Sequence, residues 1–161
     1  MKNGVHAALL SLVCTVFMGC FSGNPPIQPL QPLGEHRARL FIYRPWGFSS
    51  ALVAPMVYIN EEKILLLKNG GYTVVTLESG GLILSTKRNS TWDSGEEHAV
   101  WLILHPGRTY YVRMQTATGF RTSSFLPQLV PEAVAVPELK RTHKMDAEKE
   151  VYTGRGNIRH P

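Results

Sequence analysis

Histidines and acidic residues are considered first, because they bind metal ions and transfer protons. His98 and His105 lie at the two ends of one apolar run, seven residues apart. In a regular strand an odd separation places two side chains on opposite faces, so these two cannot share a metal ion. His143 and Asp146 have i, i+3 spacing, but two ligands do not make a metal site. We therefore expect neither a metal ion nor another cofactor.

The other polar residues form no catalytic motif. The Gly-x-Ser-x-Gly turn of α/β-hydrolases does not occur in this chain. Glu96 and Glu97 offer two carboxylates for glycoside hydrolysis, yet adjacent acids in a polar loop are typical of solvent-facing charges. Gly70-Gly71 and Gly80-Gly81 precede no phosphate-binding lysine and indicate turns. We predict no catalytic residue and a protein that is not an enzyme.

Cys20 has the clearest chemistry, because it follows a segment with the pattern of an export signal. Lys2 precedes an apolar run from Ala7 to Met18, which is shorter than the roughly 20 apolar residues of a bilayer span. The run ends in Gly19-Cys20, which resembles the lipobox of bacterial lipoproteins. The resemblance implies cleavage between Gly19 and Cys20 and attachment of acyl chains such as palmitate to Cys20.

Two other interpretations of this segment remain open, an ordinary secretory signal and an uncleaved anchor with a chance cysteine. In bacteria with two membranes, lipoproteins without Asp after the cysteine are typical of the outer membrane. Phe21 holds that position, so the resemblance implies the outer membrane and its periplasmic face. Cys14 lies in the apolar run, so the chain after Cys20 has no thiol for a disulfide, a redox pair or a zinc site.

Composition divides the chain into four segments. Residues 1–19 form the predicted lipoprotein signal peptide. Residues 20–36 hold four prolines and predict an extended tether. Residues 37–140 form the predicted β-sandwich domain, and residues 141–161 a polar, flexible tail.

Short runs separated by turn residues predict an all-β domain. Because the loops are short, neighbouring strands should be antiparallel, which gives a small antiparallel β-sandwich with a short C-terminal helix or tail. Pro137 would lie in the first turn of that helix, and His98–Leu104, apolar on both faces, should be a central strand. The predicted strands are Arg37–Arg44, Met56–Asn60, Lys63–Leu67, Tyr72–Leu77, Leu82–Lys87, His98–Leu104, Arg108–Gln115 and Phe120–Leu126.

The net charge of +5 does not by itself indicate a nucleic-acid partner. Residues 20–139 contain ten basic and nine acidic side chains, so the folded domain is nearly neutral. A nucleic-acid-binding domain would carry a basic stripe on its fold. The positive excess lies in residues 140–161 and indicates a solvated tail, or weak attraction to an anionic surface. We expect no nucleic-acid partner.

Aromatic residues at predicted strand ends and outer faces are the remaining candidates for binding. Such side chains can line a recognition surface, but more often they cover the edge of the core. The six candidates are Tyr43, Trp46, Phe48, Trp92, Tyr111 and Phe120.

Five motifs together resemble a family of bacterial lipoproteins that is described only as a domain of unknown function. They are Ala38–Pro45, Val57–Asn60, Gly70–Tyr72, Ser79–Gly81 and Gly107–Arg113, in the order in which the family has them. The resemblance covers roughly residues 37–140 and implies a prealbumin-like β-sandwich on a lipid anchor. It carries over no functional residue.

Two positions depart from the family pattern. Glu61 follows Asn60 where the family usually has glycine, and Gly80-Gly81 replaces a Pro-Gly turn. We expect the hairpin at Asn60 to be looser or differently wound, because glycine adopts a left-handed backbone more easily than glutamate does.

The sequence as a whole predicts a membrane-anchored lipoprotein of the bacterial cell envelope with a non-catalytic binding or structural domain. Its partners would be the membrane, through the lipid anchor, and another envelope protein or a cell-wall component. Two alternatives stay open. One is an envelope hydrolase whose site is assembled from scattered residues, and the other is a soluble periplasmic binding protein in which Cys20 is not modified.

Overall fold

Strands whose side chains alternate between inward and outward positions can form two sheets that pack face to face. The computed structural model describes residues 30–48, 51–87, 97–118 and 123–147. Its elements are β1 (Arg37–Tyr43), β2 (Met56–Ile59), β3 (Glu62–Leu66), β4 (Gly71–Glu78), β5 (Gly80–Lys87), β6 (His98–Leu104), β7 (Thr109–Thr118), β8 (Ser123–Val130), α2 (Glu132–Leu139) and β9 (His143–Lys144).

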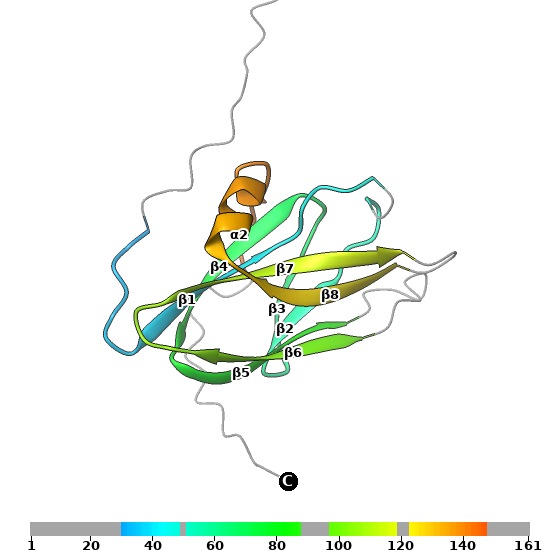
Figure 1. Cartoon of the computed structure of the whole chain (residues 1–161). Helices are drawn as coiled ribbons and strands as arrows, with labels where there is room; N and C mark the ends of the chain where they lie inside the picture. The colour runs from blue at the N-terminus through cyan, green and yellow to red at the C-terminus, as the bar shows by residue number, and fades with distance from the viewer. Residues whose placement is uncertain (1–29, 49–50, 88–96, 119–122, 148–161) are drawn as a thin grey trace, which may run out of the picture.

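The strands form two sheets that pack face to face (Figure 1). One has five strands in the order β8-β7-β1-β4-β9, and the other has four in the order β3-β2-β5-β6. The domain is therefore an all-β sandwich, as the sequence predicts. Six of the eight predicted strands differ from the observed ones by no more than two residues at either end. The other two, β7 and β8, extend further toward the C-terminus.

The pairing of β1 departs from the antiparallel prediction. β1 pairs antiparallel with β4 on one side and parallel with β7 on the other. β9 also pairs parallel, with β4. Short loops require antiparallel pairing only between consecutive strands, and neither parallel pair is consecutive in the chain. The five-stranded sheet is therefore mixed, while the four-stranded sheet is antiparallel throughout.

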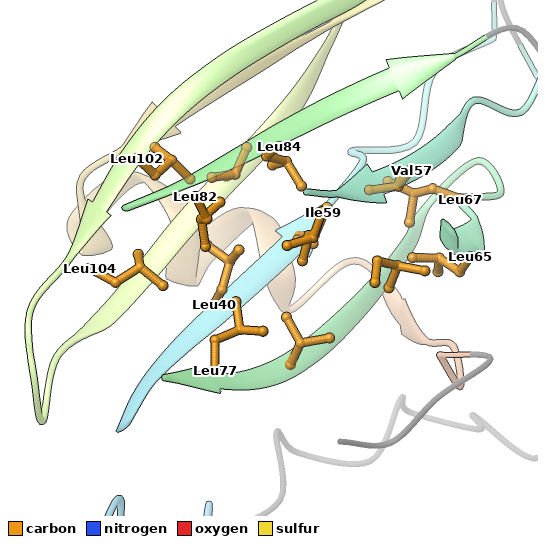
Figure 2. Packing of buried hydrophobic residues seen from close by; sticks show 14 of the residues in the cluster. Leu40, Val57, Ile59, Leu65, Leu67, Leu77, Leu82, Leu84, Leu102 and Leu104 are labelled. Carbon is orange, nitrogen blue, oxygen red and sulfur yellow. The ribbon is translucent and has the colours of Figure 1, made fainter. Parts of the chain in front are cut away.

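The main core fills the space between the two sheets. Ala38, Leu40 and Ile42 of β1 are fully buried there, as their alternation predicts. Figure 2 shows Leu40 and Leu77 from one sheet facing leucines from the other. Each fully buried aliphatic side chain of this kind contributes about 1.5–3 kcal/mol to stability.

A second cluster covers the opposite face of the five-stranded sheet. Helix α2 packs across this face and buries Ala135 and Leu139. Beneath it lie Phe41, with its ring stacked 5.1 Å from the ring of Tyr111, and Tyr43, which is fully buried. β1 is therefore buried on both of its faces.

The helix begins earlier than the sequence predicts. It starts at Glu132 after Pro131, and Pro137 lies inside it rather than in its first turn. A proline cannot donate a backbone hydrogen bond, so Pro137 is tolerated here because the helix is short and packs firmly on the sheet.

The predicted tail also begins later than residue 141. The backbone amide of His143 donates to the carbonyl of Gly70, and that of Met145 donates to Tyr72. Gly71 permits this approach, because a Cβ at that position would collide with the sulfur of Met145. Residues 141–147 thus continue the sandwich, and residues 148–161 lie outside the described part.

β6 is an edge strand and not the predicted central strand. It has one hydrogen-bonded neighbour, β5, among the described residues. Because side chains alternate between the two faces and no described helix covers the outer face of this sheet, Leu102 and Leu104 lie in the core while Trp101 and Ile103 are exposed.

The turn between β2 and β3 has a left-handed backbone at two consecutive residues. Asn60 has φ 48° and Glu61 has φ 70°, so the turn has the positive φ values that favour Asn-Gly. The amide of Asn60 donates to the carbonyl of Ile83, and the amide of Ile83 donates to Oδ1 of Asn60. These bonds hold the turn against β5 and keep Glu61 in an unfavourable conformation.

Glu61→Gly should raise the free energy of unfolding by about 1 kcal/mol, because a side chain at positive φ costs roughly that much. Urea denaturation followed by circular dichroism measures the change. Glu62→Gly, one residue further into β3, is the matched control and should lower stability. A loss of stability in both variants would contradict the strain at Glu61.

Candidate interaction surface

The outer face of the four-stranded sheet carries a group of exposed apolar side chains, which we call the sheet-face patch: Ile83, Trp101 and Ile103. They are 46%, 56% and 61% exposed. Strand pairing brings them together, because Ile83 lies opposite Trp101 and Gly81 lies opposite Ile103. Their neighbours Leu82, Leu84, Leu102 and Leu104 point inward, so the patch is the outward half of two alternating strands.

Glycine shapes the patch at its centre. The indole ring of Trp101 lies over Gly81, and a Cβ on that glycine would come within 3.2 Å of the ring. Further along the same face, the ammonium of Lys87 lies 4.9 Å from the ring centre of Tyr58. The surface is therefore flat and apolar with a cation at one end, and its chemistry favours the burial of apolar area over proton transfer.

The two sheets differ in what covers their outer faces. Helix α2 lies over the five-stranded sheet, whereas no helix among the described residues lies over the four-stranded sheet (Figure 1). β8 closes the side of the sandwich near β6. There the hydroxyl of Thr86 in β5 donates a hydrogen bond to the carbonyl of Phe125 in β8 at 2.7 Å. The open part of β6 is thus its outer face.

The structure divides the six aromatic candidates into three groups. Trp46 and Phe48 are exposed, at 67% and 85%. Tyr43 and Tyr111 are buried beneath α2, so for them the structure excludes a recognition surface, the less favoured of the two roles considered. Trp92 and Phe120 lie outside the described residues.

Sequence reasoning missed the sheet-face patch. In the run Trp101-Leu102-Ile103-Leu104 every residue is apolar, so periodicity does not separate the inner face from the outer one. The patch depends on whether another element covers the outer face of this sheet, and that is not readable from the run itself.

The buried hydroxyl of Tyr43 belongs to a polar network that fastens α2 to the sheet. It donates to Oε2 of Glu138 at 2.5 Å, and Arg113 forms an ion pair with Oε1 of the same carboxylate at 2.9 Å. Arg113 also donates to Gln128 of β8. Burial, and then the hydrogen bond to Glu138, hold the pKa of Tyr43 well above its usual value. Burial likewise raises the pKa of Tyr72 and of Tyr111.

A buried arginine lies at the end of β1. The side chain of Arg44 donates to the carbonyl of Val53 at 2.5 Å, and its guanidinium lies 4.5 Å from the ring centre of Phe125. Burial lowers its pKa to about 10, so the side chain remains charged at neutral pH. Arg44 therefore joins the two ends of the loop between β1 and β2.

A basic groove lies on the outer side of the five-stranded sheet. Residues 31–34 run back along β1 and β4, and a cavity of about 360 Å³ separates them from residues 144–147. Arg37, Arg39 and Lys144 line it together with Asp146. Cations outnumber acids here, so the groove favours anions.

The residues considered for metal binding and hydrolysis do not assemble. Among the described residues, no three His, Cys, Asp or Glu side chains come close enough to hold a metal ion. His143 lies in β9, while Asp146 lines the basic groove. Glu97 is exposed, and its neighbour Glu96 lies outside the described part.

The proposed lipid-attachment site, Gly19-Cys20, also lies outside the described residues. Within the described part, no helix is both long and apolar enough to cross a membrane.

These features define a small β-sandwich domain with one sheet face that exposes apolar side chains and that no described helix covers. The chain belongs to the family described as "Protein of unknown function (DUF2846)", whose model matches residues 34–126. The match spans more than half of the chain and includes β1 to β7. It confirms the resemblance to a family of unknown function. No curated protein matches the chain.

The raised pKa of Tyr43 gives stability a defined pH dependence. Above pH 10.0, the ordinary tyrosine pKa, the unfolded chain loses this proton while the folded protein keeps it. The free energy of unfolding should therefore fall as pH rises past 10.0, by up to about 1.4 kcal/mol per pH unit for each such tyrosine.

Urea denaturation between neutral pH and pH 11 measures this fall. Tyr43→Phe should make it shallower, because the variant has no proton to lose at this position. Tyr58→Phe, outside the cluster under α2, is the control and should leave the slope unchanged. Equal slopes for wild type and Tyr43→Phe would refute the role of Tyr43.

Proposed function

We propose that this chain is a lipid-anchored protein of the bacterial cell envelope, and that its sandwich is a non-catalytic module that binds another envelope protein. One observation carries the binding role: Ile83, Trp101 and Ile103 form an apolar surface over an otherwise well-buried sandwich. A contiguous apolar patch on a sheet face is a candidate contact site for a partner.

The residues of the patch suit a protein partner. Tryptophan at the centre of a flat surface buries a large area with few rotatable bonds, which is why it is frequent among the residues that dominate binding energy. Trp101 lies over Gly81, where the absence of a side chain leaves room for its indole ring. Polar groups at the border, such as Ser85 and Lys87, would supply the hydrated rim.

The proposed anchor rests on Gly19-Cys20 and the apolar run before it. Each methylene group buried in lipid contributes about 0.8 kcal/mol, so two or three acyl chains on Cys20 would hold the protein permanently on its membrane. With Phe21 next to the cysteine, we propose the periplasmic face of the outer membrane. Anchoring would confine the search for a partner to the membrane surface, which raises its effective concentration.

Cys20→Ala tests the anchor. The wild-type protein should begin at Cys20, carry the mass of acyl chains and sediment with the outer membrane. The variant should lack the acyl mass and leave the outer-membrane fraction. If wild type and variant have the same unacylated mass and both remain soluble, the anchor is wrong and a soluble periplasmic binding protein replaces it.

A photo-reactive side chain at Ile103 tests the binding role in living cells. It should form an adduct with one envelope protein, and Trp101→Ser in the same chain should abolish that adduct. Val134, an exposed apolar residue on α2, is the matched control position. Adducts that form equally from Ile103 and Val134, or that survive Trp101→Ser, would show that the patch is not the binding surface.

A further inference from the structure

The loop between β1 and β2 exposes three large apolar side chains that the proposed binding surface does not use. Trp46, Phe48 and Leu52 are 67%, 85% and 101% exposed, the largest exposures among the described hydrophobic residues. They lie within seven residues of one another, at the end of the sandwich where β1 ends. We call them the loop cluster.

The base of this loop is held in place on both sides. The side chain of Arg44 donates to the carbonyl of Val53, which joins the two ends of the loop. The side-chain amide of Asn69 bonds both the amide and the carbonyl of Gly47, at 3.0 and 2.9 Å. A loop of this kind presents its apolar side chains at little further cost in conformational entropy.

Two cationic side chains, those of Arg141 and Lys68, lie near the root of the loop cluster, together with Glu138, which is paired with Arg113. Trp46 lies against Gly70 beside the imidazole of His143, and it shares a surface hollow with Arg141. Lys68 precedes Asn69 in the turn that holds Gly47. Aromatic and aliphatic side chains with a cationic border are the combination that binds anionic lipid surfaces.

The start of the described chain lies along the outer side of the five-stranded sheet. Residues 31–34 lie against β1 and β4, and the carbonyl of Gln31 accepts a hydrogen bond from Arg39 in the first half of β1. The same groove is bordered by Lys144, which pairs with Tyr72 near the loop end. Nine residues separate Cys20 from Leu30, a reach of about 30 Å at full extension.

We propose that the loop cluster inserts into the anionic lipid surface to which Cys20 is anchored, and that it orients the domain with the loop end toward the membrane. The proposal rests on the proposed lipid anchor, because attachment at Cys20 would keep the domain close to the membrane. The insertion itself depends on the side chains of the loop. In this orientation the sheet-face patch faces sideways, away from the lipid and open to a protein partner.

Tryptophan fluorescence measures insertion directly. The chain has three tryptophans, so Trp92→Phe with Trp101→Phe leaves Trp46 as the reporter, and Trp46→Phe with Trp92→Phe leaves Trp101 as the matched control. Each full-length chain, in the form that the host produces, is reconstituted into vesicles of phosphatidylethanolamine and phosphatidylglycerol with brominated acyl chains. The mass of the same sample reports whether Cys20 is acylated.

Trp46 should be quenched several-fold more than Trp101 and should emit at shorter wavelength than in solution. Replacing Phe48 and Leu52 by Ser should weaken the quenching of Trp46, because each removed side chain lowers the lipid affinity of the loop roughly tenfold or more. Replacing phosphatidylglycerol by phosphatidylcholine should weaken it too, because it removes the anionic charge.

Equal quenching of Trp46 and Trp101, or stronger quenching of Trp101, would overturn the proposal. An acylated chain with unquenched Trp46 would refute insertion and leave the anchor standing. An unacylated chain with quenched Trp46 would refute the anchor and leave insertion standing. If Trp92→Phe impairs folding, an environment-sensitive dye on Leu52→Cys gives the same readout with all tryptophans present, with the parent chain labelled in parallel.

Discussion

Burial of both faces of β1 is the constraint on which the rest of the structure depends. Its inward residues, such as Leu40 and Ile42, require the second sheet, and its outward residues, Phe41 and Tyr43, require α2. β4 and β7 satisfy its two hydrogen-bonding edges. The same strand also connects the predicted tether at one end to the exposed loop at the other. A single element thus links the packing of the domain to the two parts of the chain that we propose to contact the membrane.

The two sheets of the sandwich have different roles because their outer faces differ. On the five-stranded sheet, the outer face is closed by α2 and by the bonds among Tyr43, Glu138 and Arg113. On the four-stranded sheet, strand β5 and edge strand β6 place Ile83 and Trp101 in solvent. Packing on the first face stabilises the domain, while the second face is the one that we propose to contact a partner. The basic groove on the outer side of the five-stranded sheet is a charged surface, in contrast to the apolar sheet-face patch.

The two exposed apolar surfaces lie on different parts of the domain. The loop cluster lies at the end of the sandwich where β1 ends, and the sheet-face patch lies on the outer face of the four-stranded sheet. Apolar side chains occur at both surfaces, but their setting differs. The loop cluster projects from a clamped loop bordered by Lys68 and Arg141, whereas the sheet-face patch is flat and extends over two paired strands. Insertion into lipid suits the first geometry, and contact with a protein surface suits the second.

The sequence by itself determined the all-β class, most strand positions and the family, because alternation and turn residues are local properties. Asn60 at a left-handed turn was readable in the same way. Only the tertiary structure decided that β1 pairs parallel with β7, that Tyr43 and Tyr111 lie under α2, and that Trp101 is exposed on an edge strand. Those outcomes depend on which strands become neighbours, and neighbours are chosen by contacts between residues far apart in the chain.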